Sequence, residues 1–447
     1  MSLNDTPRAD RLHIGIFGKR NSGKSSLINA LTGQDIALVS DTPGTTADPV
    51  YKSMELHPVG PVVFIDTAGF DDEGSLGKLR VERTYAALDK TDIAVLVMAS
   101  DDVETKNLSD EVHWLGLFES RKIPVIITVN GREDAAGPQN TGRRFSGGSG
   151  SDGKSAVEKS ADKKLAAGKP ADKKSVTGKS AYEEYAGEKP LFGKYPLIKL
   201  NARTGEGIEN LRGEIEQAAR GDFPCRSILG DIVKEGSLVL LVMPQDIQAP
   251  KGRLILPQVQ TLRELLDRKC AALSTTADGL ESTLGMLNRA PDLIITDSQC
   301  FGQVWEAKPE KSRLTSFSVL FAAYKGDIDV FAKGALALDD MTENSKVLIA
   351  EACTHVPLSE DIGREKIPNM LRKRYGSGIS ITNVNGSDFP DAGGLKEFDL
   401  VIHCGACMFN RKHVMSRIEA ALAAGVPITN YGIAIAKLTG ILDKIEI

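Results

Sequence analysis

The stretch GKRNSGKS, residues 18–25, is the feature that most constrains the fold of this chain. It follows the apolar run LHIGIF and precedes SLINAL, which has the spacing of a helix. In this strand, loop and helix context the pattern G-x-x-x-x-G-K-S binds phosphates, because its glycines turn backbone amides toward them. Lys24 would neutralise phosphate charge, and the Ser25 hydroxyl would ligate Mg²⁺. The predicted loop residues are Gly18, Asn21, Ser22, Gly23, Lys24, Ser25 and Ser26.

Two further motifs follow at the expected distance. DTPGTTADP supplies Thr46, which could cap the metal, and FIDTAG supplies Asp66 at a strand end and Gly69, whose amide could meet the γ-phosphate. With the loop, these motifs resemble the first three elements of translation-factor-type GTPases. The resemblance implies that GTP and Mg²⁺ bind here, and that Lys24, Thr46, Asp66 and Gly69 are the catalytic residues.

The elements that select guanine depart from the GTPase pattern. Where that pattern has N-K-x-D, this chain has Asn130, Gly131, Arg132 and Glu133, and its S-A-K element is Asn-Ala-Arg at residues 201–203. Glu133 is a carboxylate with one extra methylene and could still pair with guanine, while the missing lysine removes a packing partner. We therefore expect guanine selection that is loosened.

Hydrolysis is expected to be slow. Phe70, not glutamine, follows DTAG, so no side chain there would orient the attacking water. Asn21 stands where K⁺-dependent GTPases resembling the MnmE type place an asparagine that helps to hold the cation. The alternative is a loop asparagine bonded to its own backbone.

Apolar runs and helical stretches alternate along the chain, which predicts an α/β protein with parallel sheets. We expect a P-loop GTPase domain over residues 10–221, a middle α/β domain over 225–310 and a C-terminal doubly wound domain over 311–447. Residues 134–190 are rich in Gly, Ser, Lys and Ala and read as a disordered low-complexity insertion. The runs SFSVLFAAY, KVLIAEA, ISITNVN, DLVIHCG and GVPITNYG read as strands of the last domain.

Charge and hydropathy limit the partners. The net charge of −5 gives no broad basic surface, so nucleic acid is not expected as a partner. No run approaches the roughly 18 to 20 apolar residues that span a membrane. Six cysteines in so long a chain fit a reducing compartment. We expect a cytoplasmic protein, with an organelle matrix as the variant that the insertion suggests.

Three cysteines and two histidines follow two of the predicted C-terminal strands. Cys353 and His355 lie in EACTHVP, and His403, Cys404 and Cys407 lie in HCGACMFN. Ligands collect beyond the carboxyl ends of strands in such sheets, so the two motifs could meet at one edge. Three thiolates suit zinc with a histidine or a 4Fe-4S cluster with one exchangeable position. A C-x-x-C dithiol working in redox chemistry is the third option.

The combination of a GTPase head with C-x-H and H-C-x-x-C resembles the HydF family of FeFe-hydrogenase maturation GTPases. The likeness extends over nearly all the chain outside the insertion, including APKGRLILPQVQTLRELL, DLIITDSQ, LIAEACTH, DIGREKIP and DLVIHCGACMFNR. It implies that the middle domain dimerises and that the C-terminal domain binds a 4Fe-4S cluster on Cys353, Cys404 and Cys407. His355 or His403 would lie near the fourth iron.

The same resemblance implies the partners. The family is a scaffold that receives a diiron precursor, assembled with radical-SAM maturation enzymes, and delivers it to apo FeFe-hydrogenase. This chain has no C-x-x-x-C-x-x-C motif, so it should not perform radical chemistry itself. Two rival hypotheses remain: a zinc-bearing GTPase in tRNA modification or ribosome assembly, and a nucleotide-gated enzyme that uses Cys404 and Cys407 as a dithiol.

Overall fold

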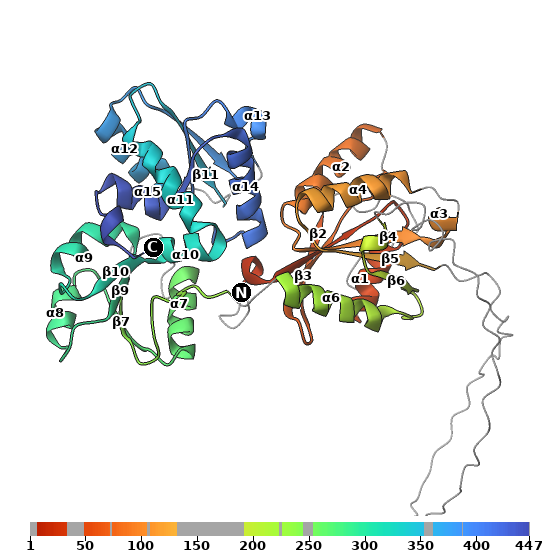
Figure 1. Ribbon diagram of the computed structural model, residues 1–447, viewed down its shortest axis with the longest axis horizontal. Helices are drawn as coiled ribbons and strands as arrows, with labels where there is room; N and C mark the ends of the chain where they lie inside the picture. Colours follow the sequence, from red (N-terminus) through yellow and green to blue (C-terminus); the bar gives the residue numbers. More distant parts are fainter. Residues whose placement is uncertain are drawn as a thin grey trace, which may run out of the picture.

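The computed structural model describes residues 7–33, 49–71, 74–104, 108–131, 192–222, 226–244, 254–352, 361–386 and 388–446. The predicted site residues Thr46, Glu133, Cys353 and His355, and the predicted insertion at 134–190, lie outside these ranges. The described chain forms three sheets, one of six strands and two of four (Figure 1). Within the described ranges, none of the helices combines the length and apolar character that crossing a membrane requires.

The first sheet forms the nucleotide-binding domain and has the order β2-β3-β1-β4-β5-β6. Its β2 runs antiparallel to β3, and the other neighbours are parallel. Every residue of β4 is buried, as expected for a parallel strand with helices on both faces. The strands are β1 (Leu12–Phe17), β2 (Val50–Leu56), β3 (Gly60–Asp66), β4 (Ile93–Ala99), β5 (Val125–Asn130) and β6 (Leu197–Leu200). The helices are α1 (Lys24–Thr32), α2 (Gly74–Leu88), α3 (Ser100–Glu104), α4 (Ser109–Ser120) and α6 (Ile208–Asp222).

The second sheet has the order β10-β9-β7-β8, with all strands parallel. Its strands are β7 (Leu238–Val242), β8 (Ala271–Thr275), β9 (Leu293–Thr296) and β10 (Arg313–Ser316). Its helices are α7 (Leu256–Asp267), α8 (Leu280–Gly285), α9 (Phe301–Ala307) and α10 (Phe317–Lys325). Because β10 pairs with β9, the middle sheet extends beyond the expected domain boundary at residues 310 and 311.

The strand prediction for SFSVLFAAY is wrong, because most of this run is helix α10. Ser316 caps the helix by accepting a hydrogen bond from the Val319 amide. The run is almost continuously apolar because α10 is buried on most of its surface, between the middle and C-terminal units. A fully buried helix and a buried strand share this pattern, so periodicity alone does not separate them.

The third sheet has the order β12-β11-β13-β14, again with all strands parallel. Its strands are β11 (Lys346–Glu351), β12 (Ser380–Asn385), β13 (Leu400–His403) and β14 (Ile428–Asn430), which confirms the four remaining strand predictions. Its helices are α11 (Ile328–Ala335), α12 (Ile367–Tyr375), α13 (Ala392–Leu395), α14 (Arg411–Ala424) and α15 (Tyr431–Leu438). Shorter turns are η1 (Arg8–Asp10), η2 (Phe192–Lys194), η3 (Ser298–Cys300), η4 (Leu336–Asp339), η5 (Ile362–Lys366) and η6 (Leu442–Lys444).

The second and third sheets are built on one plan. The strand orders β8-β7-β9-β10 and β12-β11-β13-β14 are equivalent. In each sheet the second strand in sequence lies at one edge, followed by the first, the third and the fourth. The register also matches, since Leu238 pairs with Ala271 as Lys346 pairs with Ser380. In both sheets an aspartate before the third strand accepts from the first strand: Asp292 from the Leu238 amide at 2.7 Å, Asp399 from the Lys346 amide at 2.8 Å.

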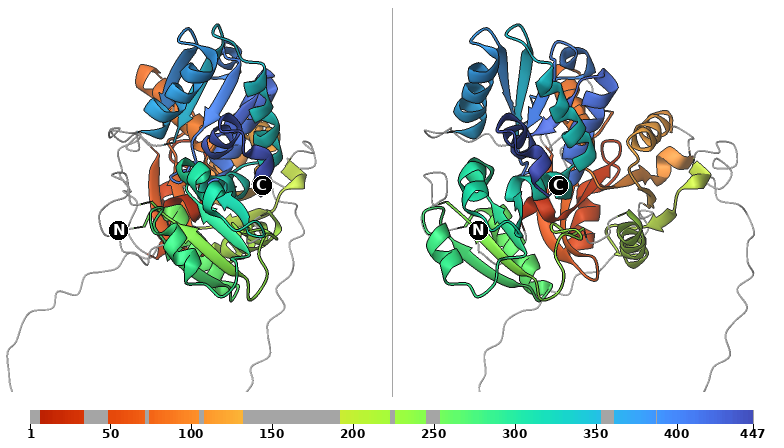
Figure 2. Two further views of the ribbon diagram at one scale, coloured as in Figure 1. Left: turned by 90° about the vertical axis from the view of Figure 1, so that its left-hand side faces the viewer. Right: turned by 60° about the vertical axis from the view of Figure 1, so that its left-hand side comes forward.

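The two units also complete each other (Figures 1 and 2). Helix α11, which follows the middle unit, covers β14, and Thr429 donates to the Phe331 carbonyl at 2.9 Å. Glu446 lies beside β10 of the middle unit. The Thr315 hydroxyl donates to the Glu446 carbonyl, and the Glu446 amide donates to the Leu314 carbonyl, both at 2.8 Å. One hydrophobic cluster contains core residues of both units. The middle and C-terminal units therefore form one packed body.

Candidate functional site

The loop from Gly18 to Gly23 joins β1 to α1 and is held by contacts with distant segments. Asn130, at the end of β5, donates to the Ser22 carbonyl at 3.1 Å and accepts from the Ala202 amide at 3.1 Å. Gly23 has φ of 95°, and a Cβ built there would lie 2.1 Å from the Asn130 amide nitrogen. Only glycine fits this position. Asn130 therefore joins the phosphate loop to the loop at residues 201–203.

Lys24, Ser25 and Asp66 meet at the carboxyl ends of β1 and β3. The Lys24 ammonium donates to the carbonyls of Gly18 at 3.0 Å and Lys19 at 2.7 Å. The Ser25 hydroxyl donates to Asp66 Oδ2 at 2.8 Å. Burial raises the pKa of Asp66, while the Ser25 hydrogen bond and the Lys24 charge oppose the shift.

Two buried oxygens at this site fit a nucleotide and its metal. Ser22 Oγ and Asp66 Oδ1 have no hydrogen-bond partner among the described residues. A buried polar atom without a partner is costly, and a phosphate or Mg²⁺ would satisfy such atoms. The donor set of Ser25 and Asp66 consists of hard oxygens, which Mg²⁺ prefers.

The segment after β3 packs directly on the phosphate loop. A Cβ on Gly69 would lie 2.7 Å from the Arg20 amide nitrogen, and that amide donates to Asp71 Oδ1 at 2.6 Å. Phe70 is buried and stacks on Trp114, with ring centroids 5.3 Å apart. The side chain in the place of a catalytic glutamine therefore belongs to the core of the domain.

A buried ion pair behind the loop was missed by sequence reasoning. Lys19 Nζ lies 3.1 Å from Glu111 Oε2, and Glu111 is completely buried on α4. Burial raises the pKa of Glu111, and the Lys19 charge opposes that rise. The pair joins the loop to α4. Lys19 occupies a variable position of the motif, so no sequence signal could have linked it to Glu111.

The C-terminal site lies where β11 and β13 end side by side. These strands are the topological switch point of their sheet, because β12 continues on one side and β14 on the other. Cys404 follows β13 directly, and its sulfur accepts hydrogen bonds from the Ala352 amide at 3.1 Å and the Ala406 amide at 3.4 Å. Ala352 immediately precedes Cys353. Cys404 and Cys407 share one loop in which Ala406 has φ of 51°.

This loop offers two thiol groups as possible metal ligands, those of Cys404 and Cys407. Burial raises the pKa of the Cys404 thiol to about 11. A metal bound to the sulfur would remove the proton outright, and the two amide donors would then stabilise the thiolate. Within the described residues no three His, Cys, Asp or Glu side chains are close enough to hold a metal. Cys353 and His355, the first half of the predicted ligand set, are not among those residues.

His403 is engaged on both sides of its ring. Nδ1 lies 2.8 Å from the Cys404 carbonyl and Nε2 lies 3.0 Å from Arg417 Nη1. Arginine only donates, so Nε2 accepts and Nδ1 carries the proton. Burial lowers the pKa of His403 to about 3, and Arg417 adds to the effect. The predicted place of His403 near the fourth iron stays a prediction, and ligation through Nε2 would require the Arg417 contact to break.

Fold and site together define a P-loop GTPase domain joined to two parallel α/β units, the second of which carries a cysteine loop at its switch point. Family models agree in each part: a 50S ribosome-binding GTPase domain matches residues 13–131. A hydrogen maturase F dimerization domain matches residues 228–326, and a hydrogen maturase F tetramerization domain matches residues 329–446. The chain belongs to the HydF family of hydrogenase maturation GTPases.

Curated relatives share the GTPase domain alone. The chain is 41% identical over 122 residues to GTPase Der of Wolinella succinogenes, covering 27% of this chain and 25% of that one. It is 44% identical over 90 residues to the tRNA modification GTPase MnmE of Chromobacterium violaceum, covering 20% of each. The chain thus spans about a quarter or less of the length of these relatives.

Among solved structures, Era of Aquifex aeolicus bound to GDP and AlF4⁻ is 15% identical, with a TM-score of 0.33. The match covers 66% of this chain and 97% of that one.

Proposed function

We propose that this protein is a GTP-binding and GTP-hydrolysing scaffold that carries a 4Fe-4S cluster. It accepts a diiron precursor and delivers it to apo FeFe-hydrogenase. The observation that carries this proposal is the hydrogen bond from the Ala352 amide to the Cys404 sulfur at 3.1 Å. It brings the residue before Cys353 into contact with the cysteine loop, at the edge where doubly wound sheets hold ligands.

For the GTPase residues we propose the roles that the resemblance implies. Lys24 would bind the outer phosphates, Ser25 and Thr46 would ligate Mg²⁺, Asp66 would orient the Ser25 hydroxyl that donates to it, and the Gly69 amide would meet the γ-phosphate. Hydrolysis is slow because Phe70 is buried against Trp114 and does not orient water. Asn21, exposed with φ of 59°, would help to hold K⁺.

Guanine selection rests on Asn130 and Glu133. Asn130 is bonded to the phosphate loop and to the 201–203 loop, so it shapes the base pocket. Glu133 would accept from the guanine ring nitrogen and amino group. ATP binding as tight as GTP binding would refute this selectivity.

At the switch point, Cys353, Cys404 and Cys407 would hold the 4Fe-4S cluster, with His355 as the histidine nearer the fourth iron. A cluster with three thiolates supplies one exchangeable iron position, which a carrier needs to accept and release a metal fragment. The Ala352 and Ala406 amides, which donate to the Cys404 sulfur, would stabilise its thiolate once a metal is bound.

The expected partners are apo FeFe-hydrogenase and the radical-SAM enzymes that assemble the precursor. The family descriptions of the middle and C-terminal units, dimerization and tetramerization, support self-association, and we propose at least a homodimer. The cytoplasm, or an organelle matrix, provides the reducing conditions that the cysteines need.

Two variants test the proposal, each measured for both GTP hydrolysis and iron content. Lys24→Ala should abolish GTP hydrolysis and leave the iron content unchanged. Cys404→Ser should remove the cluster and leave hydrolysis largely intact. Both should fail to activate apo FeFe-hydrogenase in a reconstituted maturation assay. Full activation by Cys404→Ser would refute the scaffold function, and loss of iron in Lys24→Ala would refute the separation of the two sites.

A further inference from the structure

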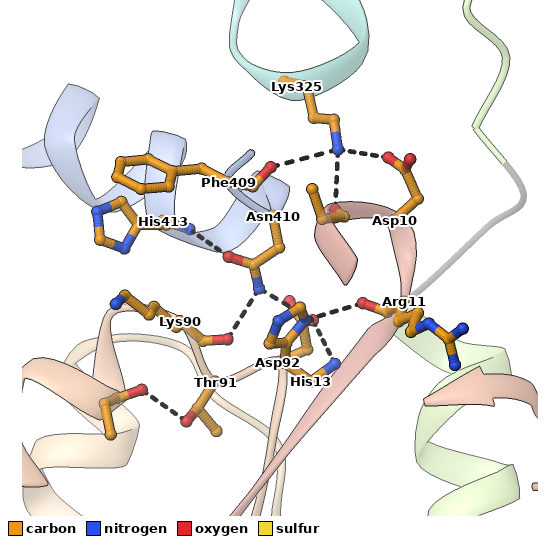
Figure 3. Close-up of polar contacts among 12 residues, drawn as sticks. Asp10, Arg11, His13, Lys90, Thr91, Asp92, Lys325, Phe409, Asn410 and His413 are labelled. Atoms are coloured by element: carbon orange, nitrogen blue, oxygen red, sulfur yellow. Dashed lines mark hydrogen bonds and ion pairs between the residues drawn. The ribbon is translucent and has the colours of Figure 1, made fainter. Parts of the chain in front are cut away.

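The cysteine loop, residues 404–410, ends on the GTPase domain (Figure 3). Asn410 Nδ2 donates to the Lys90 carbonyl at 2.8 Å and to Asp92 Oδ2 at 3.3 Å. Asn410 is buried, and its Oδ1 caps α14 by accepting from the His413 amide at 3.3 Å. The Asn410 side chain thus caps α14 and is also hydrogen-bonded to the GTPase domain.

Lys325, at the end of α10, secures the other side of the same loop. Its buried ammonium donates to the Phe409 carbonyl at 3.3 Å, to the Ala9 carbonyl at 2.8 Å and to Asp10 Oδ1 at 2.5 Å (Figure 3). It therefore joins the middle unit, the start of the GTPase domain and the cysteine loop. As long as the ammonium stays buried, losing these acceptors would leave its charge unpaired, which is costly.

Lys90 and Asp92, the GTPase-domain residues that accept from Asn410, belong to segments that lead to the nucleotide site. Lys90 follows α2, the helix that begins soon after Asp66 and Gly69, and the Thr84 hydroxyl in α2 donates to the Ala68 carbonyl at 3.4 Å. Asp92 accepts from the His13 amide at 2.9 Å in β1, the strand that leads into the phosphate loop. In GTPases the segment that meets the γ-phosphate is the one that moves on hydrolysis.

We propose that Asn410 and Lys325 are positioning residues that link nucleotide binding to the state of the cysteine loop. A shift of α2 or β1 would move the Lys90 carbonyl and the Asp92 carboxylate. Asn410, which is hydrogen-bonded to both, would then move the end of the cysteine loop. The inference rests on the proposed function, since it needs GTP at one end and the cluster at the other.

Thermodynamic linkage gives a direct readout. If the cluster changes the affinity for GTP by some factor, GTP changes the cluster equilibrium by the same factor. The measured quantity is the dissociation constant of a fluorescent non-hydrolysable GTP analogue. It is determined on the full chain with a reconstituted cluster and without one, and the ratio of the two constants reports the coupling.

The key variant is Asn410→Ser. Serine still caps α14, but its hydroxyl is too short to bond both Lys90 and Asp92, so the structural role is kept while the hydrogen bonds to the GTPase domain are lost. A second variant is Lys325→Met with Asp10→Asn. It removes the hydrogen bond to the Phe409 carbonyl without substituting any residue of the cysteine loop, and it leaves no buried carboxylate unpaired. The matched control is Gln260→Ala, which removes a hydrogen bond of 2.5 Å between α7 and Asp10 outside the loop.

In the wild type we expect a ratio of about fivefold or more, in line with typical coupling between sites. The ratio should fall to about one in both test variants and stay at the wild-type value in Gln260→Ala. A wild-type ratio of one, an unchanged ratio in both test variants, or a lost ratio in the control overturns the inference. Absence of iron from the wild type would instead refute the proposed function.

Discussion

Lys19 and Glu111 show how one residue pair shapes the phosphate loop. The Glu111 side chain is completely buried and that of Lys19 nearly so, with 3.1 Å between Nζ and Oε2. We predict that Lys19→Met lowers the free energy of unfolding of the GTPase domain by about 3 to 5 kcal/mol, because it leaves a buried carboxylate unpaired. Urea unfolding followed by tryptophan fluorescence measures the change.

The double variant Lys19→Met with Glu111→Leu is the control for this pair. Replacing both charges with apolar groups of similar size should recover most of the lost stability. If Lys19→Met alone were as stable as the wild type, the pair would contribute nothing to the fold.

His413 makes stability depend on pH at the interface of Figure 3. Burial lowers the pKa of His413 to about 2, and the Arg417 charge acts in the same direction. An unfolded histidine has a pKa of about 6.5, so below that pH the unfolded state binds one more proton. The stability from neutral His413 is complete above pH 6.5 and is lost as the pH falls.

We therefore predict that His413→Asn reduces the pH dependence. Below pH 6.5 the stability advantage of the wild type over the variant should shrink by about 1.4 kcal/mol per pH unit. Denaturant titrations at pH 7.5, 6.0 and 5.0 measure the difference. Parallel curves for both proteins would show that His413 is not buried as a neutral ring.

Some site residues were predictable singly because a motif fixes their chemistry. Gly23, Lys24 and Ser25 were singled out by the phosphate-binding pattern and Asp66 by FIDTAG, and in the structure Ser25 donates to Asp66. Asn410 and Lys325 carry no such signal, since an asparagine before a helix reads only as a cap and a lysine at a helix end only as a surface charge. Their contacts join residues about 320 positions apart.

At the scale of elements, four of the five C-terminal runs predicted as strands are strands, and the fifth is helix α10. The runs KVLIAEA and DLVIHCG, which form β11 and β13, are short and apolar, which suits parallel strands. Helix α10 shares that composition because neighbouring elements surround it. Tertiary burial, rather than local preference, decided its structure.

The N-terminal cap of α15 gives a prediction at the scale of one element. Asn430 Oδ1 accepts from the Gly432 amide at 2.8 Å and from the Ile433 amide at 3.3 Å. We expect Asn430→Ala to lower the stability of the C-terminal unit by about 0.5 to 2 kcal/mol, because two amides lose their acceptor. Thermal unfolding by circular dichroism measures it, and Asn430→Ser, which restores an acceptor, should recover most of the loss. No loss in Asn430→Ala would show that the cap is dispensable.

Over the whole molecule, the shared plan of the middle and C-terminal units was not apparent in the sequence. Asp292 and Asp399 hold equivalent places, as do the caps Ser316 and Asn430, yet the residues between them differ. What persists is strand register and capping, which short sequence patterns do not reveal. The third strand of one unit ends at Thr296 and is followed by Asp297, whereas that of the other ends at His403 and is followed by Cys404, the first residue of the cysteine loop.

Because each unit covers an edge of the other, we predict that they unfold together. A Cβ on Gly432 would lie 2.3 Å from Ser318 Oγ, across the contact between α15 and α10. Gly432→Ala in the C-terminal unit should therefore lower the unfolding midpoint reported by Trp305 in the middle unit. The measurement uses Trp114→Phe as background, so that Trp305 is the sole tryptophan. A Trp305 transition that does not shift would mean that the units unfold separately.

The central claim is that the cysteine loop and Cys353 hold a 4Fe-4S cluster beside a GTPase domain. Iron and acid-labile sulfide analysis of the oxygen-free full chain, with electron paramagnetic resonance of its reduced state, tests it most directly. We expect about four irons and four sulfides per chain and the signal of a reduced 4Fe-4S cluster, both lost in Cys404→Ser. A colourless wild-type protein holding one zinc, or no metal after reconstitution, would contradict the account.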